Sequence, residues 1–275
     1  MTAPADLPGG TVPRDRAQLR EHLVAQAIAG PVATPREANL RNYAQLADRV
    51  SGWTFGVSFA GRWDRTDVLA LMAERVGVDP DPRHTEGRDV IDPDRTLDAL
   101  DALGGVVGAV AAARGSVLLA TGHPAGLLAV YLAVAESLRA AGCAILEPAS
   151  GHRYARRDGS VLEVRYLGGV GMVSSRGGLD HTHSPRPMAA MLAGLAPARP
   201  DLVIADHGFA GAAAEAGVRT VGFADSNDPA LFVAQAEGKL AAVVPLDDNV
   251  TPDRYAPLTA YLVDVIERAF TPSAP

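Results

Sequence analysis

The stretch SVLLATGHPAG, residues 116–126, decides the fold of this chain. Its apolar first half, residues 116–121, is typical of a buried strand, and the glycines and proline that follow indicate a tight turn into a helix. The same order of apolar run, turn and helical segment recurs up to the C-terminal helix, which is predicted from residue 252. The further apolar runs lie at residues 143–148, 170–175, 201–205, 220–224 and 240–245. Strands that alternate with helices predict a mostly parallel sheet with helices on both faces, a Rossmann-like three-layer α/β fold.

Two additions to this parallel core are predicted. Residues 151–175 are expected to form an inserted β-hairpin, with a turn at residues 157–160. The N-terminal segment is expected to be helical, with two helices within residues 16–50. The second of these helices would have Thr34 as its N-cap and Pro35 at its first helical position.

The segment that leads into the core has mixed signals. Residues 53–59 alternate between apolar and polar types, which predicts a short strand. Asp64 is expected to cap the next helix, residues 77–95 are expected to be a connection, and residues 96–113 are expected to form a buried helix.

The domain organisation is predicted to be simple. Residues 1–15 are rich in proline and glycine and are expected to form a flexible tail. No convincing linker follows, so residues 16–275 predict a single α/β domain. Within it a helical N-terminal part, residues 16–113, would pack on a parallel α/β part, residues 114–270.

Composition narrows the classes of partner. The 275 residues carry a net charge of −7 and contain no basic tract, which argues against nucleic acid and anionic membranes as partners. The longest apolar stretch, near residues 127–135, is too short to span a bilayer, and the N-terminus does not resemble a signal peptide. A cytoplasmic location is therefore expected. The single cysteine, Cys143, excludes a disulfide framework and a zinc site built from thiolates.

Histidines provide the main functional signal. Five of the seven follow predicted strands or the turns just after them: His123, His152, His181, His183 and His207. Open α/β folds bind ligands outside the carboxyl ends of their strands. We therefore expect several of these imidazoles to contribute to one polar site at the edge of the sheet. His152 is the exception, because it is more simply explained as an exposed residue of the inserted hairpin than as a lid contact.

Glycines at two predicted strand-to-helix turns suggest an anion site. Gly122 and Gly126 follow one strand, and Gly208 and Gly211 follow another, so a phosphate could approach the free N–H groups of a helix start. Plain tight turns and close helix packing explain these glycines nearly as well, and neither turn is a P-loop or a GxGxxG motif. Arg176 is a candidate bidentate phosphate ligand, and Asn227 is a candidate substrate contact.

The motif Asp180-His181-Thr182-His183 is the leading metal-site candidate. Two imidazoles two residues apart can reach the same ion from an extended backbone. Asp180 could add a ligand or orient a ring, and the alternative is a polar loop before a helix capped by Ser184.

Acidic residues near the ends of later strands extend this candidate site. Asp206 precedes His207, and Asp225 follows the strand at residues 220–224 without an obvious capping role. Asp228 is expected to be a helix N-cap. The acidic turn at residues 247–249 fits either Mg²⁺ or ordinary turn chemistry.

Six motifs together resemble a family of actinobacterial proteins of about this length that are catalogued as predicted phosphatases. The resemblance covers residues 30–257, and its motifs are NYAQLAD (42–48), TGHPAGLL (121–128), HTHSPRPM (181–188), IADHGFAGAA (204–213), GFADSNDPAL (222–231) and VVPLDDNV (243–250). The resemblance implies phosphomonoester chemistry and assigns no catalytic residues.

The leading hypothesis is a metal-dependent phosphatase that acts on a small phosphorylated metabolite. A divalent ion, Mg²⁺, Mn²⁺ or Zn²⁺, would bind near His181 and His183, with Asp180 and Asp225 as further ligands. His123, His207 and Asp206 are the catalytic candidates, with His123 as the general acid.

Two alternatives and one open question accompany this hypothesis. A non-catalytic Rossmann-like module could bind a nucleotide or sugar phosphate with the same groups. A sugar-phosphate isomerase or transferase would use His123 or His207 as a base without a metal. The small-residue helix at residues 209–217 would suit packing within a monomer or across a homodimer.

Overall fold

The computed structural model of the protein describes residues 15–156 and 159–270. Residues 1–14 of the predicted tail and half of the predicted turn at residues 157–160 lie outside this part of the chain. Within it, the main sheet has nine strands in the order β11-β10-β9-β3-β7-β6-β5, with β4 beside β3 and β8 beside β7. The mutually parallel strands are β3 (Ser116–Ala120), β4 (Ala144–Ile145), β7 (Val170–Ser175), β9 (Leu202–Asp206), β10 (Thr220–Ala224) and β11 (Ala242–Pro245).

The inserted hairpin extends one side of this sheet. Antiparallel strands β5 (Arg153–Ala155) and β6 (Val161–Leu167) continue from β7, and β8 (Gly178–Asp180) folds back along β7. The predicted α/β class with a mostly parallel sheet and an inserted hairpin is therefore confirmed. Sequence patterns did not indicate β8, because its three residues are too few to show an alternation.

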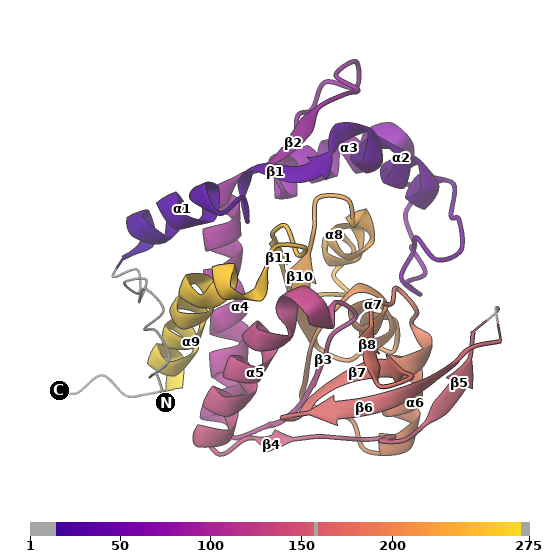
Figure 1. Cartoon of the computed structure of the whole chain (residues 1–275), viewed down its shortest axis with the longest axis vertical. Helices are drawn as coiled ribbons and strands as arrows, with labels where there is room; N and C mark the ends of the chain where they lie inside the picture. Colours follow the sequence, from indigo (N-terminus) through magenta and orange to yellow (C-terminus); the bar gives the residue numbers. More distant parts are fainter. Residues whose placement is uncertain (1–14, 157–158, 271–275) are drawn as a thin grey trace, which may run out of the picture.

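Helices cover both faces of the sheet (Figure 1). On one face α4 (Pro93–Ala112), α5 (Pro124–Ala140) and α9 (Ala256–Phe270) pack against one another. On the other face lie α6 (Arg186–Leu195), α7 (His207–Glu215) and α8 (Pro229–Ala236). The two-sided cover explains why β9, β10 and β11 are buried at every position and appear as continuous apolar runs in the sequence.

The connections around β3 create a topological switch point. The chain leaves β3 through α5 toward β4 and β7 on one side, and returns through α6 to β9 on the other side. Since β3 and β9 are parallel neighbours, their carboxyl ends open beside each other between diverging connections. Ligands bind at such points in open α/β folds.

The N-terminal segment lies across the end of the sheet where β9, β10 and β11 finish (Figure 1). It consists of α1 (Arg16–Ala25), β1 (Gly30–Pro35), α2 (Arg36–Ala47), α3 (Arg65–Arg75) and β2 (Arg88–Ile91). Strands β1 and β2 form a separate antiparallel pair, so the segment is a mixture of helices and a hairpin, not helical alone.

Several predicted details of this segment were wrong. Thr34 and Pro35 belong to β1, and α2 begins at Arg36, because the Thr34 hydroxyl donates to Asp225 instead of capping a helix. Residues 53–59 form turns and bends, and their apolar side chains face the neighbouring elements without a partner strand. The predicted connection at residues 77–95 contains β2 and the first turn of α4. The predicted Asp64 cap is confirmed by a complete capping box with Asp67.

Smaller differences affect the later elements. Strand β4 has only two residues, and α7 begins at His207, two residues earlier than expected. The last helix is preceded by a short 3-10 turn, η1 (Pro252–Tyr255). Helix α7 is buried along most of its length between α6, α8 and the sheet, so its small residues serve packing within the chain.

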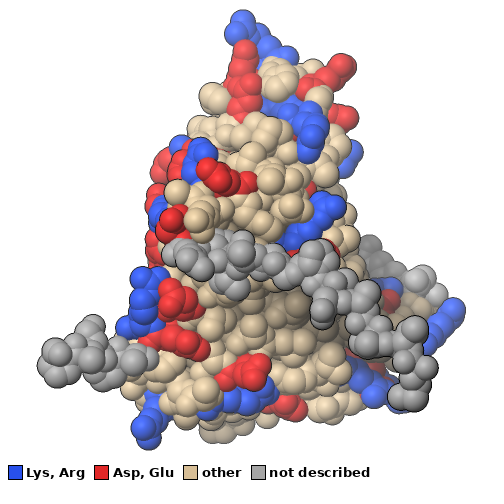
Figure 2. Space-filling view, turned by 60° about the vertical axis from the view of Figure 1, so that its left-hand side comes forward, with Lys and Arg blue, Asp and Glu red and all other residues tan. Residues whose placement is uncertain are grey.

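Two surface properties complete the description. None of the described helices is long and apolar enough to cross a membrane. Figure 2 shows basic and acidic side chains close to one another on the described part of the face in view.

Candidate active site

The carboxyl ends of four parallel strands border a cleft of about 710 Å³. The N-terminal segment, which lies across this end of the sheet (Figure 1), contributes Thr34, Asn42 and Trp53 to the lining of the cleft. Polar side chains that line it are Thr34, Asn42, His123, His181, His183, His207, Asp225, Asn227, Asp228, Asp247, Asp248, Asn249, Thr251 and Arg254. The cleft is therefore lined by polar groups from segments far apart in the chain, from Thr34 to Arg254.

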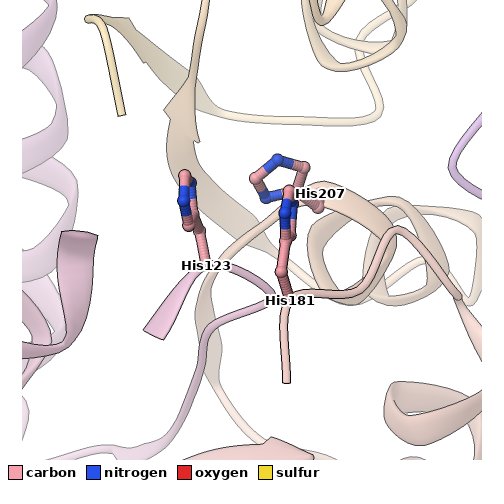
Figure 3. A group of neighbouring side chains, drawn as sticks. All are labelled: His123, His181 and His207. Atoms are coloured by element: carbon pink, nitrogen blue, oxygen red, sulfur yellow. The ribbon is translucent and has the colours of Figure 1, made fainter. Parts of the chain in front are cut away.

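Four imidazoles form the centre of this cleft, and we call His123, His181, His183 and His207 the imidazole cluster. The His123 and His181 rings are stacked, with centroids 4.5 Å apart, and the His183 and His207 rings are stacked at 4.6 Å. Figure 3 shows the rings of His123 and His181 standing side by side and the ring of His207 next to them. The Nε2 atoms of His181 and His183 are 3.0 Å apart, so these two nitrogens point into one small volume.

A short return strand places two of these rings. Strand β8 carries the chain back along β7, and the Thr182 N–H then donates to the Gly122 carbonyl at 2.9 Å. This bond fixes the residues on either side of Thr182, His181 and His183, next to the turn that holds His123. The motif thus reaches the sheet edge through β8, not directly from the apolar run at residues 170–175.

Asp206 fixes His207 and the turn after β3. Its fully buried carboxylate accepts from the Thr121 hydroxyl, the Gly122 N–H and the Tyr131 hydroxyl. It also lies 2.8 Å from Nδ1 of His207, which leaves Nε2 of that ring to face the cleft. A carboxylate behind an imidazole sets the tautomer and orientation of the ring, as it does around many metal sites.

The backbone of His207 is in the left-handed region, with φ of +45°. This conformation is uncommon for a residue with a side chain and costs on the order of 1–3 kcal/mol. It turns the chain from β9 into α7 and directs the ring toward the cleft, where Nε2 lies 3.3 Å from Asp228 and 3.5 Å from Asp248.

At the glycines predicted to bind phosphate, the space that a side chain would occupy is taken by backbone carbonyl groups of other segments. A Cβ at Gly122 would lie 2.4 Å from the Thr182 carbonyl oxygen, and one at Gly208 would lie 2.2 Å from that of His183. At Gly126 it would meet the Asp248 carbonyl at 2.2 Å, and at Gly211 the Phe55 carbonyl at 2.1 Å. The Gly122 N–H is already bonded to Asp206. These glycines explain how distant segments come close enough to form the cleft, without any ligand.

Phe55 closes the cluster from the N-terminal segment. Its buried ring makes an edge contact with His183 at 5.1 Å between centroids and a tilted contact with His207 at 5.5 Å. The loop at residues 53–59 therefore supports the imidazoles instead of forming the strand that its alternation predicted.

Three buried carboxylates lie beside the imidazoles, and we call Asp225, Asp247 and Asp248 the acidic cluster. One oxygen from each lies within 4.8 Å of those of the other two. Asp225 accepts from the Thr34 hydroxyl at 2.7 Å and from the Asn227 amide at 3.0 Å. Asp247 accepts from the backbone N–H groups of Ala33 and Asn249.

Burial and neighbouring charges give the imidazoles different proton affinities. Burial lowers the pKa of His183, and the nearby His207 and His181 lower it further, to about 3. The pKa of His181 is lowered for the same reasons. Burial opposes protonation of His207 too, but Asp228 and Asp206 outweigh it and raise its pKa well above the ordinary value. Asp248 likewise outweighs burial at His123 and raises its pKa.

The donor set fits a divalent cation. His123, His181 and His207 form one group of potential ligands within 4.8 Å of one another, and His183, His207 and Asp228 form another. Nδ1 of His123 and Oδ1 of Asp228 are buried without a hydrogen-bond partner among the described residues. Imidazole nitrogens that converge on one small volume, with a carboxylate behind one ring, suit a divalent cation.

Comparison with known proteins shows which family the chain belongs to. A family model described as Phosphatase matches residues 14–270, which is nearly the whole chain. The chain belongs to this phosphatase family. It is also 49% identical over 253 residues to Phosphatase SCO2771 of Streptomyces coelicolor, an alignment that covers 90% of this chain and 95% of that protein. The resemblance inferred from the motifs is confirmed, and membership in the phosphatase family implies a hydrolase of phosphoric esters.

Three of the residues singled out in the sequence lie outside the cleft of this phosphatase-family protein. Arg176 is exposed on the turn between β7 and β8 and lines a separate hollow on the hairpin. Asp180 accepts from Ser175 and lies 3.6 Å from Arg156, so its carboxylate faces the hairpin. His152 is exposed, because β4 ends after two residues and the chain then turns away.

Other site residues of this phosphatase-family protein escaped the sequence analysis. Asp228 precedes α8 but makes no capping hydrogen bond, and it faces His207 instead. Asp248 was recognised only as one residue of an acidic turn, although it touches both His123 and His207. The roles of the predicted catalytic, phosphate and metal residues stay predictions.

Proposed function

We propose that this protein is a metal-dependent phosphomonoester hydrolase that acts on a small phosphorylated metabolite. The observation that carries the proposal is the convergence of the imidazole cluster at the switch point of the sheet, within a cleft large enough for a small molecule. Membership in the phosphatase family supplies the reaction class.

The chain's own residues suggest a division of roles. His183, His207 and Asp228, whose ligand atoms lie within 4.8 Å of one another, would hold the cation. His181 would join them, because its Nε2 lies 3.0 Å from that of His183, and Asp206 would keep the His207 ring in place. A cation at this position polarises a phosphoryl group and makes a water molecule more acidic.

His123 is the best candidate for the proton donor. It lines the cleft, and Asp248 raises its pKa and so favours its protonated form. In the hydrolysis, the oxygen of a water molecule forms a bond to phosphorus while the bond between phosphorus and the ester oxygen breaks. The leaving oxygen then takes a proton from His123, and inorganic phosphate and an alcohol result.

Arg254 supports an anionic substrate. It is the one lysine or arginine among the described residues that line the cleft, and it stands on η1 at the rim. A guanidinium at this position can bind a phosphate or a second acidic group of the substrate.

The test uses protein purified without an affinity tag. We expect release of inorganic phosphate from p-nitrophenyl phosphate and from at least one phosphorylated metabolite in a panel. EDTA should abolish this release, and a divalent cation should restore it.

Three results would contradict the proposal in different ways. Activity that resists EDTA would remove the metal from the proposal. Thermal stabilisation by a phosphorylated ligand without turnover would favour a binding module. Turnover of a sugar phosphate without release of inorganic phosphate would favour an isomerase or transferase.

A further inference from the structure

The acidic cluster is not used by the roles proposed above, apart from the contact between Asp248 and His123. Its members are almost completely buried, with exposed fractions of 3% for Asp225, 2% for Asp247 and 5% for Asp248. Carboxylates are seldom buried to this degree unless a cation or a dense set of donors compensates them.

The hydrogen-bond donors that the chain supplies to Asp225 and Asp247 are neutral groups, whereas Asp248 faces the imidazoles of His123 and His207. The donors to Asp225 and Asp247 are backbone amides, hydroxyls and the Asn227 side chain. Among the described residues, no lysine or arginine forms an ion pair with any of the three carboxylates. Each Asp247 oxygen accepts a single N–H and retains a second lone pair for a cation. Each Asp225 oxygen already accepts two hydrogen bonds, so Asp225 would exchange one of them for the cation.

Asp248 provides a second, independent observation. Its Oδ2 atom is buried and has no hydrogen-bond partner among the described residues. The same oxygen lies 3.5 Å from Nε2 of His207, and Oδ1 lies 3.1 Å from Nδ1 of His123 without hydrogen-bond alignment. Asp248 therefore belongs to the acidic cluster and also borders the imidazole cluster.

We propose that the acidic cluster is a second cation site, adjacent to the imidazole cluster and joined to it by the Asp248 carboxylate. The proposal deepens the proposed function, on which it rests, because it makes the centre binuclear. Its ligands are all oxygens, which favour hard cations such as Mg²⁺ and Mn²⁺, whereas the imidazole cluster favours Zn²⁺ and similar ions. Pairs of neighbouring cations recur in enzymes that cleave phosphate esters.

The test compares metal binding in three versions of the chain. Protein purified without an affinity tag is stripped with a chelator, loaded with one equivalent of Zn²⁺ and titrated with Mn²⁺. Free Mn²⁺ is followed by electron paramagnetic resonance, and the retained metals are counted by elemental analysis. We expect the wild-type chain to retain one Zn²⁺ and one Mn²⁺.

Two variants distinguish cation binding by the acidic cluster from weak binding by any acidic residue on the surface. Asp247→Asn should keep its Zn²⁺ and bind Mn²⁺ at least tenfold more weakly. Asp253→Asn, which alters an exposed carboxylate six residues further along, should retain both metals. Retention of Mn²⁺ by Asp247→Asn at the wild-type level, or binding of a single cation by the wild-type chain, would overturn the proposal.

A measurement on the wild-type chain alone covers the case in which Asp247→Asn does not fold. With two equivalents of Mn²⁺, the resonance spectrum should show magnetic coupling between two neighbouring ions, and two uncoupled signals would overturn the proposal. Phosphate release is measured on the same samples. If the protein binds one cation and hydrolyses the ester, only the second cation site is refuted. If it binds two cations and hydrolyses no ester, only the proposed function is refuted.

Discussion

At the scale of single residues, Asp206 and His207 show how the site is held in place. Four donors surround the Asp206 carboxylate, and one of them is the Nδ1 atom of His207. The contacts of His207 on both ring nitrogens offset the cost of its left-handed backbone. The orientation of the His207 imidazole therefore comes with a strained backbone at that residue.

The variant Asp206→Asn tests this arrangement. An amide presents an N–H₂ group to neighbours that are themselves donors, and it removes the charge behind His207. We expect the affinity for the activating cation to fall by roughly 10–100-fold, the range seen when partners behind metal-binding histidines are changed. Calorimetric titration of the stripped protein measures this affinity.

Asp201→Asn is the matched control for that variant. Asp201 immediately precedes the same strand, β9, and binds Ser116 at the opposite end of the sheet. Its removal should leave cation affinity unchanged. If both variants bind the cation like the wild-type protein, Asp206 has no role in positioning His207.

At the scale of elements, small residues decide which segments meet. Gly122 and Gly208 admit the loop that carries His181 and His183, and Gly126 admits the backbone of Asp248 at the start of α5. In the sequence, these glycines indicated turns and an anion site. Only the fold reveals that they serve contacts between segments, because the approaching backbones come from distant positions in the chain.

Gly126→Ala tests this role of glycine. The added methyl group would lie 2.2 Å from the Asp248 carbonyl oxygen, so the loop after β11 must shift. We expect a loss of about 1–3 kcal/mol of folding stability, as for other overpacked sites. Because the shift moves Asp248, activity should fall by roughly 10²-fold.

Gly105→Ala provides the comparison, with urea unfolding and phosphate release as the measurements. Gly105 is an exposed position inside α4 with no atom within 4 Å of the added methyl group. This variant should gain about 0.5–1 kcal/mol of stability and keep full activity. Equal behaviour of the two variants would refute the proposed contact at Gly126.

A buried ion pair ties the N-terminal hairpin to α2. Nη1 of Arg36 lies 2.9 Å from Asp89 on β2, and both side chains are excluded from solvent. Asp89→Ala leaves the Arg36 charge buried, so we expect a loss of about 3–5 kcal/mol in urea unfolding. The exposed pair of Arg65 and Asp48 is the control, and Asp48→Ala should cost about 0–1 kcal/mol. Similar losses in the two variants would contradict the structural importance of the buried pair.

At the scale of the whole molecule, the parallel core was predictable and the N-terminal segment was not. Continuous apolar runs such as residues 201–205 and 220–224 identify buried strands because both faces of the sheet are covered. The N-terminal hairpin pairs β1 with β2 across more than 50 residues. Both strands alternate in burial, but their buried positions include Gly30, Thr34 and Asp89, so no apolar alternation is visible in the sequence. The prediction at residues 53–59 also failed, because Trp53 lines the cleft and Phe55 packs against two imidazoles, so their spacing does not reflect a strand.

The site was predictable in part for the same reason. His207 and Asp225 directly follow β9 and β10, and His123 closes the turn after β3, so the rule that places ligands at strand ends found all three. Asp228 and Asp248 look like turn residues, and only their position against His207 reveals a different role. Asp180 belongs to the histidine motif and Arg176 lies close to it, but Asp180 bonds Ser175 on β7 and Arg176 lines a separate hollow.

The most direct test of the central claim is a crystal of the protein grown with Zn²⁺ or Mn²⁺, measured at the absorption edge of the metal. We expect an anomalous peak in the cleft between the Nε2 atoms of His181, His183 and His207, at ordinary coordination distances of about 2.0–2.1 Å for zinc. An anomalous map without a peak in contact with these imidazoles, from protein that releases inorganic phosphate under the same conditions, would contradict a metal centre built at the ends of these strands.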